Sequence, residues 1–132
     1  RVGNEEDRKV PVSSYRDLLV WKAAMDIAVD CYTATKTFPV SEAYGMTSQI
    51  RRSASSIAAN IAEGYGRENR GSFIQFLRVA QGSLKEVESH LLLSGRVWLL
   101  SSNEVERLLG RTEELGKMLR AMIRSLQRKG QQ

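Results

Sequence analysis

The sequence is poor in the side chains from which small proteins build metal sites and cross-links. Among its 132 residues there is one cysteine, Cys31, and one histidine, His90. One cysteine forms no disulfide within a chain, and together with one histidine it falls short of a tetrahedral zinc set. The Glu-x-x-His motifs of di-iron bundles are also missing. We therefore expect no metal or other cofactor, with Cys31 a small buried residue and His90 a surface or interface residue.

Long apolar runs and enzyme motifs are missing as well. No run approaches the roughly 20 apolar residues of a membrane helix, and the first residues are too charged for the apolar part of a secretory signal. Glycine-rich phosphate loops, H-E-x-x-H and G-x-S-x-G do not occur, and Gly64-Tyr65-Gly66 lacks a third glycine and a preceding strand. We expect a cytoplasmic protein without a membrane span and without catalytic activity.

The residues that are abundant favour helices. There are only two prolines, 42% of the residues are hydrophobic, and the length suits one domain with a single core. The fold class predicted is all-α, an antiparallel up-and-down four-helix bundle. Residues 1–14 have mixed charges and no apolar periodicity, so we expect a flexible lead-in there, followed by the bundle over 15–129 and a tail over 130–132.

The helix expected over about 15–37 has an unusually wide apolar arc, and Phe38-Pro39-Val40 ends it. Its main stripe consists of Leu18, Trp21, Met25, Ala28, Val29 and Tyr32. The positions that widen this stripe are Val20, Ala24, Ile27 and Cys31. An arc this wide exceeds what one bundle core needs. Two interpretations stay open: part of the arc meets another subunit, or the bundle buries this helix more deeply.

The next helix is expected to begin at Ser41 or Glu42 and to end at Gly64, in a left-handed conformation. Its apolar stripe is Met46, Ile50, Ala54, Ile57 and Ile61. A polar row that includes Arg52, Ser56, Asn60 and Glu63 flanks this stripe. Because buried polar groups need partners, we favour a hydrogen-bonded seam between helices or subunits over a ligand-binding site.

The third helix is expected over about 72–100, with a narrow stripe formed by Phe73, Leu77, Ala80, Leu84, Val87, Leu91 and Trp98. Close backbone packing is expected at Gly82-Ser83, and Gly95 is expected to mark a kink or an early end. The caps Ser101 to Asn103, followed by Glu104 and Glu106, predict the start of the fourth helix. That helix is expected to run to about Arg128 and to bury Leu108, Leu115, Leu119, Met122 and Leu126.

The order of residues resembles a known family, the four-helix-bundle proteins encoded in intervening sequences of bacterial large-subunit ribosomal RNA genes. The segments that carry the resemblance are Gln49-Ile50-Arg51-Arg52, Ser56-Ile57, Asn60 to Gly64, Gly66-Arg67, Leu18 to Lys22, Phe38-Pro39 with Glu42, and Gln81 to Leu84 with Glu86. The resemblance implies a homo-oligomer, a ring of five subunits, and no enzyme chemistry. It extends distantly to the accessory protein of diversity-generating retroelements, a basic bundle that partners a reverse transcriptase.

The positive charge is concentrated in the second half of the chain. Of the net charge of +5, all lies in residues 64–132, which hold twelve basic and seven acidic side chains. One face of the last helix is expected to carry Lys117, Arg120, Arg124 and Arg128, and the main candidate set for phosphate binding consists of these four and Lys129. The third helix is expected to carry a secondary set, Arg78, Lys85 and Arg96. These residues form either a solvated face or a phosphate-binding surface.

The charge distribution and the family resemblance support two hypotheses for the function. The first is a non-catalytic nucleic-acid-binding or scaffold protein that contacts RNA or DNA phosphates through the basic surface of an oligomer. The alternative is a protein-interaction module that recruits a polymerase or reverse transcriptase. No interleaved aromatic residue is available in the basic stripe, so base stacking has no platform there.

Overall fold

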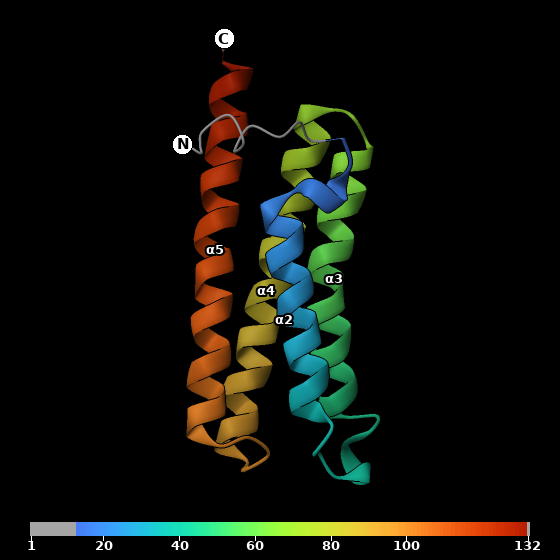
Figure 1. Cartoon of the computed structure of the whole chain (residues 1–132), viewed down its shortest axis with the longest axis vertical. Coiled ribbons are helices and arrows are strands. Elements are labelled where there is room, and N and C mark those ends of the chain that lie inside the picture. The colour runs from blue at the N-terminus through green and yellow to red at the C-terminus, as the bar shows by residue number, and fades with distance from the viewer. Residues whose placement is uncertain (1–12, 132) are drawn as a thin grey trace, which may run out of the picture.

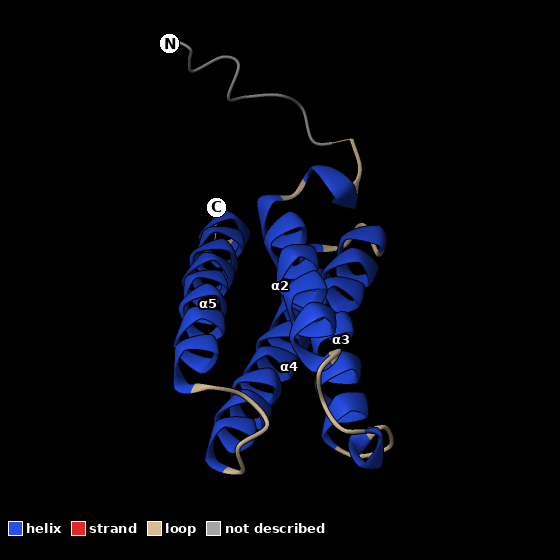
Figure 2. Cartoon of the chain, turned by 60° about the horizontal axis from the view of Figure 1, so that its bottom comes forward, coloured by secondary structure: helices blue, strands red, loops and turns tan. Residues whose placement is uncertain are grey.

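The computed structural model describes residues 13–131. These residues form the short 3₁₀ helices η1 (Tyr15–Asp17) and η2 (Val40–Glu42) and the long helices α2 (Leu19–Thr35), α3 (Met46–Gly66), α4 (Arg70–Arg96) and α5 (Ser102–Gly130). Figure 2 shows only helices and loops in the described part of the chain. The predicted all-α fold is confirmed. The lead-in expected over 1–14 lies almost wholly outside the described residues, and Gly130 belongs to α5.

The four long helices run alternately down and up the molecule (Figure 1). Each packs against its neighbours in the chain, and α5 lies against α2, which closes the bundle. The α2–α3 and α4–α5 loops lie at one end, and the α3–α4 loop lies at the other end. This is the antiparallel up-and-down arrangement that the sequence predicts.

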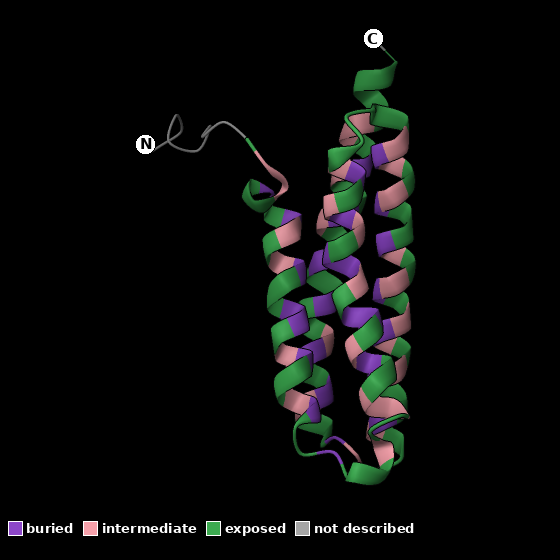
Figure 3. Cartoon of the chain, turned by 90° about the vertical axis from the view of Figure 1, so that its right-hand side faces the viewer, coloured by how far each residue is buried: buried purple, intermediate pink, exposed green. Residues whose placement is uncertain are grey.

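A single core runs along the bundle axis, and Figure 3 shows its buried positions facing inward on every long helix. Met46 of the stripe predicted for α3 is half-buried, whereas Ile50, Ala54, Ile57 and Ile61 are buried as predicted. The same holds on α4 from Phe73 to Leu91. On α5, Leu108, Leu115 and Leu119 are buried, whereas Met122 and Leu126 are half-buried.

The core face of α2 differs from the main stripe expected for it. The buried residues are Val20, Ala24, Ile27, Ala28, Cys31 and Thr35, whereas the exposed fractions of Met25, Val29 and Tyr32 are 40%, 59% and 44%. The small residues Ala24 and Cys31 let α2 approach its neighbours closely, and this favours their face over the bulkier one. In addition, Leu18 is extended (φ −73°, ψ 129°) and separates η1 from α2, so no continuous helix begins at Tyr15.

The ends of α3 also differ from the prediction. Its first residue is Met46, whose backbone N–H donates to Glu42 Oε1 at 2.9 Å, and η2 precedes it as a separate turn. Gly64 does not end α3, which continues to Gly66, and the left-handed residue is Glu68 (φ 55°). Gly64 is needed instead for close packing, because a Cβ atom there would lie 2.5 Å from Phe76 Cβ on α4.

The turn between α4 and α5 corrects two further expectations. α4 ends at Arg96, so Gly95 lies at an early end of the helix and Trp98 lies beyond it. Trp98 is not part of the core stripe: it is 90% exposed and left-handed (φ 69°). The close packing expected at Gly82-Ser83 is absent at Gly82, where a Cβ atom would meet nothing within 4 Å, whereas the Ser83 hydroxyl is hydrogen-bonded to that of Ser56 on α3. The predicted cap of α5 is present, with Glu104 N–H donating to Ser101 Oγ at 3.1 Å.

Two glycines in comparable helical positions allow a matched test of the α3–α4 contact. We expect Gly64→Ala to lower the free energy of unfolding by about 1–3 kcal/mol, because the new methyl group overpacks against Phe76. Gly82→Ala should raise it by about 0.5–1 kcal/mol, because alanine is the better helix former and has free space. Urea denaturation followed by circular dichroism measures both; equal effects of the two changes would contradict the contact.

Candidate nucleic-acid interface

The basic residues singled out in the sequence are all exposed in the structure. This is true of the five on α5 and the three on α4: Lys117, Arg120, Arg124, Arg128, Lys129, Arg78, Lys85 and Arg96. Lys85 lies 3.0 Å from Glu88 Oε1 on its own helix. The other seven form no salt bridge with an acidic group among residues 13–131. Their positive charge is therefore not offset by a neighbouring carboxylate in that part of the chain.

The primary and secondary basic sets meet in the seam between α4 and α5. One hollow in this seam is lined by Arg78, Gln81, Arg120, Ile123, Arg124 and Gln127. The adjoining hollow is lined by Gln81, Gly82, Leu84, Lys85, Gly116 and Arg120. Gln81 and Arg120 belong to both, so the two hollows form one surface feature, which we call the cationic groove. Lys117, Arg128, Lys129 and Arg96 do not line it.

Two glycines explain why the seam is hollow at this level. Gly82 on α4 and Gly116 on α5 both line the hollow that contains Lys85 and Arg120. Neither glycine contributes a side chain, and a Cβ atom on Gly116 would lie 3.6 Å from both Arg120 Nη1 and Leu84 Cδ2. The Arg120 side chain therefore lies over a part of the helix surface from which no side chain projects.

Three arginines outside the cationic groove do have acidic partners. Arg67 lies 2.9 Å from Glu63, Arg107 lies 2.9 Å from Glu104, and Arg111 lies 2.9 Å from Asp30 Oδ2. The hydrogen bond between Arg107 and Glu104 raises the pKa of the Arg107 guanidinium and lowers that of the Glu104 carboxyl group. Arg78, Arg120 and Arg124 of the cationic groove differ from these three arginines, because they form no such pair within the described range.

The polar row of α3 is split between two kinds of contact. Arg52 Nη2 donates to Glu86 of α4 and, at 2.8 Å, to Gln49 Oε1, while the Ser56 hydroxyl is hydrogen-bonded to that of Ser83 on α4. The other two residues remain on their own helix: Asn60 Nδ2 donates to the Ser56 carbonyl at 2.8 Å, and Glu63 pairs with Arg67. Arg52 and Ser56 therefore link α3 to α4 within one chain.

Glu86 is the residue of this α3–α4 seam that the sequence analysis did not single out as a partner for Arg52. The Arg52 guanidinium, and to a smaller degree His90 at 3.4 Å, lower the pKa of the Glu86 carboxyl group below its usual range. The available signal was the spacing of four between Glu86 and His90, which places both on one helix face. Which face meets Arg52 depends on the rotation of α4, and spacing alone does not give that rotation.

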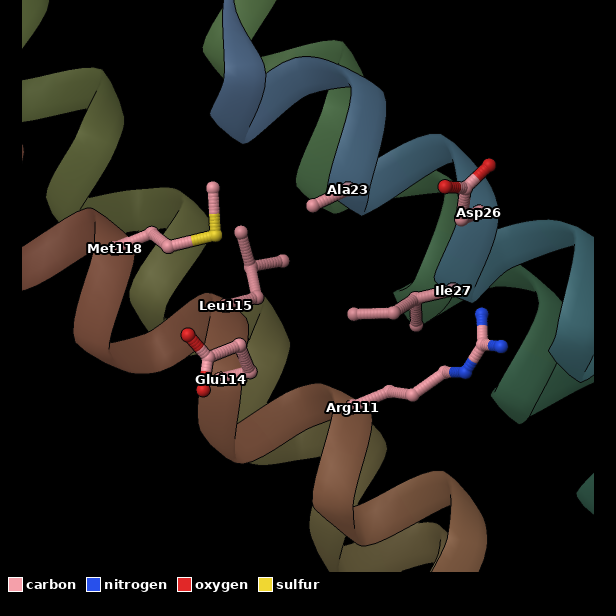
Figure 4. Close-up of a pocket in the computed structure, with 7 residues that line it drawn as sticks. All are labelled: Ala23, Asp26, Ile27, Arg111, Glu114, Leu115 and Met118. Carbon is pink, nitrogen blue, oxygen red and sulfur yellow. The ribbon is translucent and has the colours of Figure 1, made fainter.

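A further pocket lies between α2 and α5 (Figure 4). The side chains of Ala23, Ile27, Leu115 and Met118 form its apolar part, with Asp26, Arg111 and Glu114 around it. It contains neither cysteine nor histidine. Burial raises the pKa of the nearby Cys31 thiol to about 12, so Cys31 is a thiol rather than a nucleophilic thiolate at neutral pH.

Residues 13–131 contain no group of three or more histidine, cysteine, aspartate or glutamate side chains placed to hold a metal ion. In the same part of the chain, no helix combines the length and apolar character needed to cross a membrane.

The comparisons with known proteins identify the family. The model of the family described as "23S rRNA-intervening sequence protein" matches residues 16–121. The chain belongs to this family. The resemblance seen in the sequence is thereby confirmed, and the matched range covers α2, α3, α4 and the part of α5 up to residue 121.

A crystal structure with the same fold comes from Bacteroides thetaiotaomicron VPI-5482 and is described as a protein with unknown function from the S23 ribosomal protein family. It is 29% identical to this chain, covers 80% of this chain and 98% of its own, and superposes with a TM-score of 0.70. No curated protein matches the sequence significantly.

The Arg52–Glu86 pair gives a pH-dependent prediction. The folded-state pKa of Glu86 is lowered, so the pair stabilises the fold above the unfolded pKa of about 4.5, and its contribution is lost as the pH falls. We expect Glu86→Gln to lower the free energy of unfolding by about 0.5 kcal/mol at pH 7, because the pair is partly exposed, and by nothing measurable at pH 3.

Urea denaturation of the wild type and the variant at both pH values measures this difference. Glu113→Gln is the matched control, because Glu113 is exposed and forms no salt bridge within the described range. A deficit of Glu86→Gln that persists unchanged at pH 3 would exclude the ionised pair as its cause.

Proposed function

We propose that this protein is a non-catalytic nucleic-acid-binding or scaffold protein of the cytoplasm that holds RNA or DNA by its phosphates. The observation that carries the proposal is the cationic groove, where Arg78, Arg120 and Arg124 converge from two helices with no acidic partner in the described range. Guanidinium groups present paired N–H donors that match phosphate oxygens. Three such groups in one groove suit a polyanion better than a small neutral ligand.

The residues outside the groove extend the same surface. Lys117 and Arg128 continue the exposed basic face of α5, Lys129 is exposed on another side of its last turn, and Lys85 and Arg96 continue the basic face of α4. Contacts of this kind fix where a nucleic acid lies without reading its sequence, because every nucleotide carries the same phosphate. The family's association with 23S rRNA intervening sequences makes structured RNA the first ligand to test.

Salt dependence tests the proposal. Each phosphate contact releases counterions, so the logarithm of the binding constant should fall linearly with the logarithm of salt concentration. We expect the double variant Arg120→Gln/Arg124→Gln to bind more weakly at low salt. Its slope should be smaller by about 1.4 to 1.8, from 0.7 to 0.9 per lost contact. Fluorescence anisotropy with a labelled RNA measures both quantities.

A matched control separates local contacts from net charge. Arg16→Gln/Lys22→Gln removes the same formal charge from exposed positions of η1 and α2, away from the cationic groove. We expect this control to bind like the wild type. Equal losses in the two double variants, or wild-type binding that does not respond to salt, would overturn the proposal.

A second proposal concerns self-association through α2. Met25, Val29 and Tyr32 are exposed and line a groove with Ala28, Thr33, Lys36 and Ser55 of α3. Bulky apolar groups clustered on one exposed face favour an interface. We propose that this face meets another copy of the chain, giving the homo-oligomer, a ring of five, that the family resemblance implies. Repetition of the cationic groove around a ring would raise the affinity for one nucleic acid through multivalency.

A charge placed in that face tests the assembly. We expect Val29→Glu to reduce the molar mass measured by light scattering to that of the 14.8 kDa monomer without loss of helical signal, because a carboxylate there would be buried unpaired. Val79→Glu is the matched control, since Val79 on α4 is similarly exposed, at 51% compared with 59% for Val29. A monomeric wild type would overturn self-association and favour the alternative, a module that presents this face to a polymerase or reverse transcriptase.

A further inference from the structure

Trp98 is the bulkiest of the exposed apolar side chains among residues 13–131. It is 90% exposed, and its backbone is left-handed with φ 69°, a conformation that usually requires glycine. Bulky residues are seldom kept in this region unless the surrounding structure holds them there. An exposed indole ring on a strained backbone is the kind of feature that contacts a ligand.

The surrounding turn fixes the position of Trp98. Its backbone N–H donates to the Gly95 carbonyl at 3.3 Å, and the next two N–H groups, of Leu99 and Leu100, donate to the Ser94 carbonyl at 2.8 and 3.2 Å. Leu100 is only 7% exposed and belongs to the core. The turn therefore draws Leu100 inward and leaves Trp98 facing solvent, so the ring is presented by packing and backbone hydrogen bonds.

Beside the ring lies a hollow of about 400 Å³, a size typical of small-ligand sites. Leu92, Val105 and Leu109 give it apolar walls from α4 and α5, whereas Arg96 and Glu106 supply the two opposite charges among its lining residues. A flat apolar ligand with polar edges fits such a site: the ring and the apolar walls contact its faces, and the carboxylate accepts hydrogen bonds from its amino groups.

This hollow lies in the same seam between α4 and α5 as the cationic groove. Arg78, Lys85 and Arg96 are separated by 7 and 11 residues, so they share one face of α4 over about 27 Å at 1.5 Å per residue. A nucleic-acid strand whose phosphates follow this face ends at Trp98. Because the hollow continues the cationic groove, its occupant should be part of the nucleic acid that the groove binds.

We propose that the Trp98 hollow receives an unpaired base of the bound nucleic acid. The indole ring stacks on the base, Arg96 contacts a flanking phosphate, and Glu106 accepts a hydrogen bond from an exocyclic amino group. The ligand class is then RNA or DNA with a single-stranded loop or end, because bases stacked inside a duplex do not expose a face. This inference rests on the proposed function and narrows it.

The test compares two probes of equal charge: a stem–loop RNA and a blunt-ended duplex RNA with the same number of phosphates. We expect Trp98→Ala to weaken stem–loop binding about 5- to 150-fold, the range found when a stacking aromatic residue is removed. Duplex binding and both salt slopes should be unchanged, because no phosphate contact is lost. Trp98→Phe should retain most of the stem–loop affinity, because a phenyl ring also stacks.

Val97→Ala is the matched control, since Val97 is an exposed apolar residue of the same turn, and we expect it to bind both probes like the wild type. If wild-type protein binds both probes and Trp98→Ala loses neither, the inference fails while the proposed function stands. If wild-type protein binds neither probe, the proposed function fails, and the inference fails with it. If Trp98→Ala reduces the molar mass in light scattering, the ring contacts another copy of the chain and the inference is overturned.

Discussion

The close packing of α3 against α4 is the contact on which the rest of the bundle depends. Ile50, Ile57 and Ile61 have no exposed surface, and the buried stripe of α4 lies against the same core. Near the end of α3, Gly64 allows Phe76 to approach the helix backbone. The Arg52–Glu86 pair and the Ser56–Ser83 hydrogen bond flank this apolar contact. Because apolar contacts slide easily past one another, these polar links favour one register of the two helices.

The same packing determines where positive charge remains exposed. Several acidic groups on α2, α3 and α5 are paired with nearby arginines, among them Asp30, Glu63 and Glu104. The seam between α4 and α5 combines glycines that leave it hollow with arginines that have no acidic partner in the described range. The cationic groove is therefore a consequence of how the helices pack around the core. The proposed nucleic acid would bind this surface without any part of the fold having to move.

Sequence reasoning succeeded where a helix has one apolar stripe. On α3 and α4 the buried faces followed from spacing alone, and on α5 the capping serine was also correct. On α2 the apolar residues cover most of the helix surface, so their spacing did not show which face is buried. Steric fit in the core favours the face that carries the small residues Ala24 and Cys31. Gly64 was assigned to a helix end because its partner, Phe76, is distant in sequence. The basic residues were identified individually, but predicting that they converge in one groove requires knowledge of how α4 and α5 are rotated relative to each other. In the same way, predicting that Trp98 is exposed requires knowledge of where α4 ends.

Because the described residues form four long antiparallel helices, the last helix ends at the same end of the bundle at which the first one begins. η1 and the last turn of α5 lie at one end of the bundle, and the turn that carries Trp98 lies at the opposite end (Figure 1). A fluorophore or surface tether joined to the last turn of α5 is therefore separated from that turn by most of the length of α5, about 43 Å for 29 residues at 1.5 Å per residue. An immobilised molecule would present its aromatic tip outward, which gives surface-based measurements unobstructed access to that end.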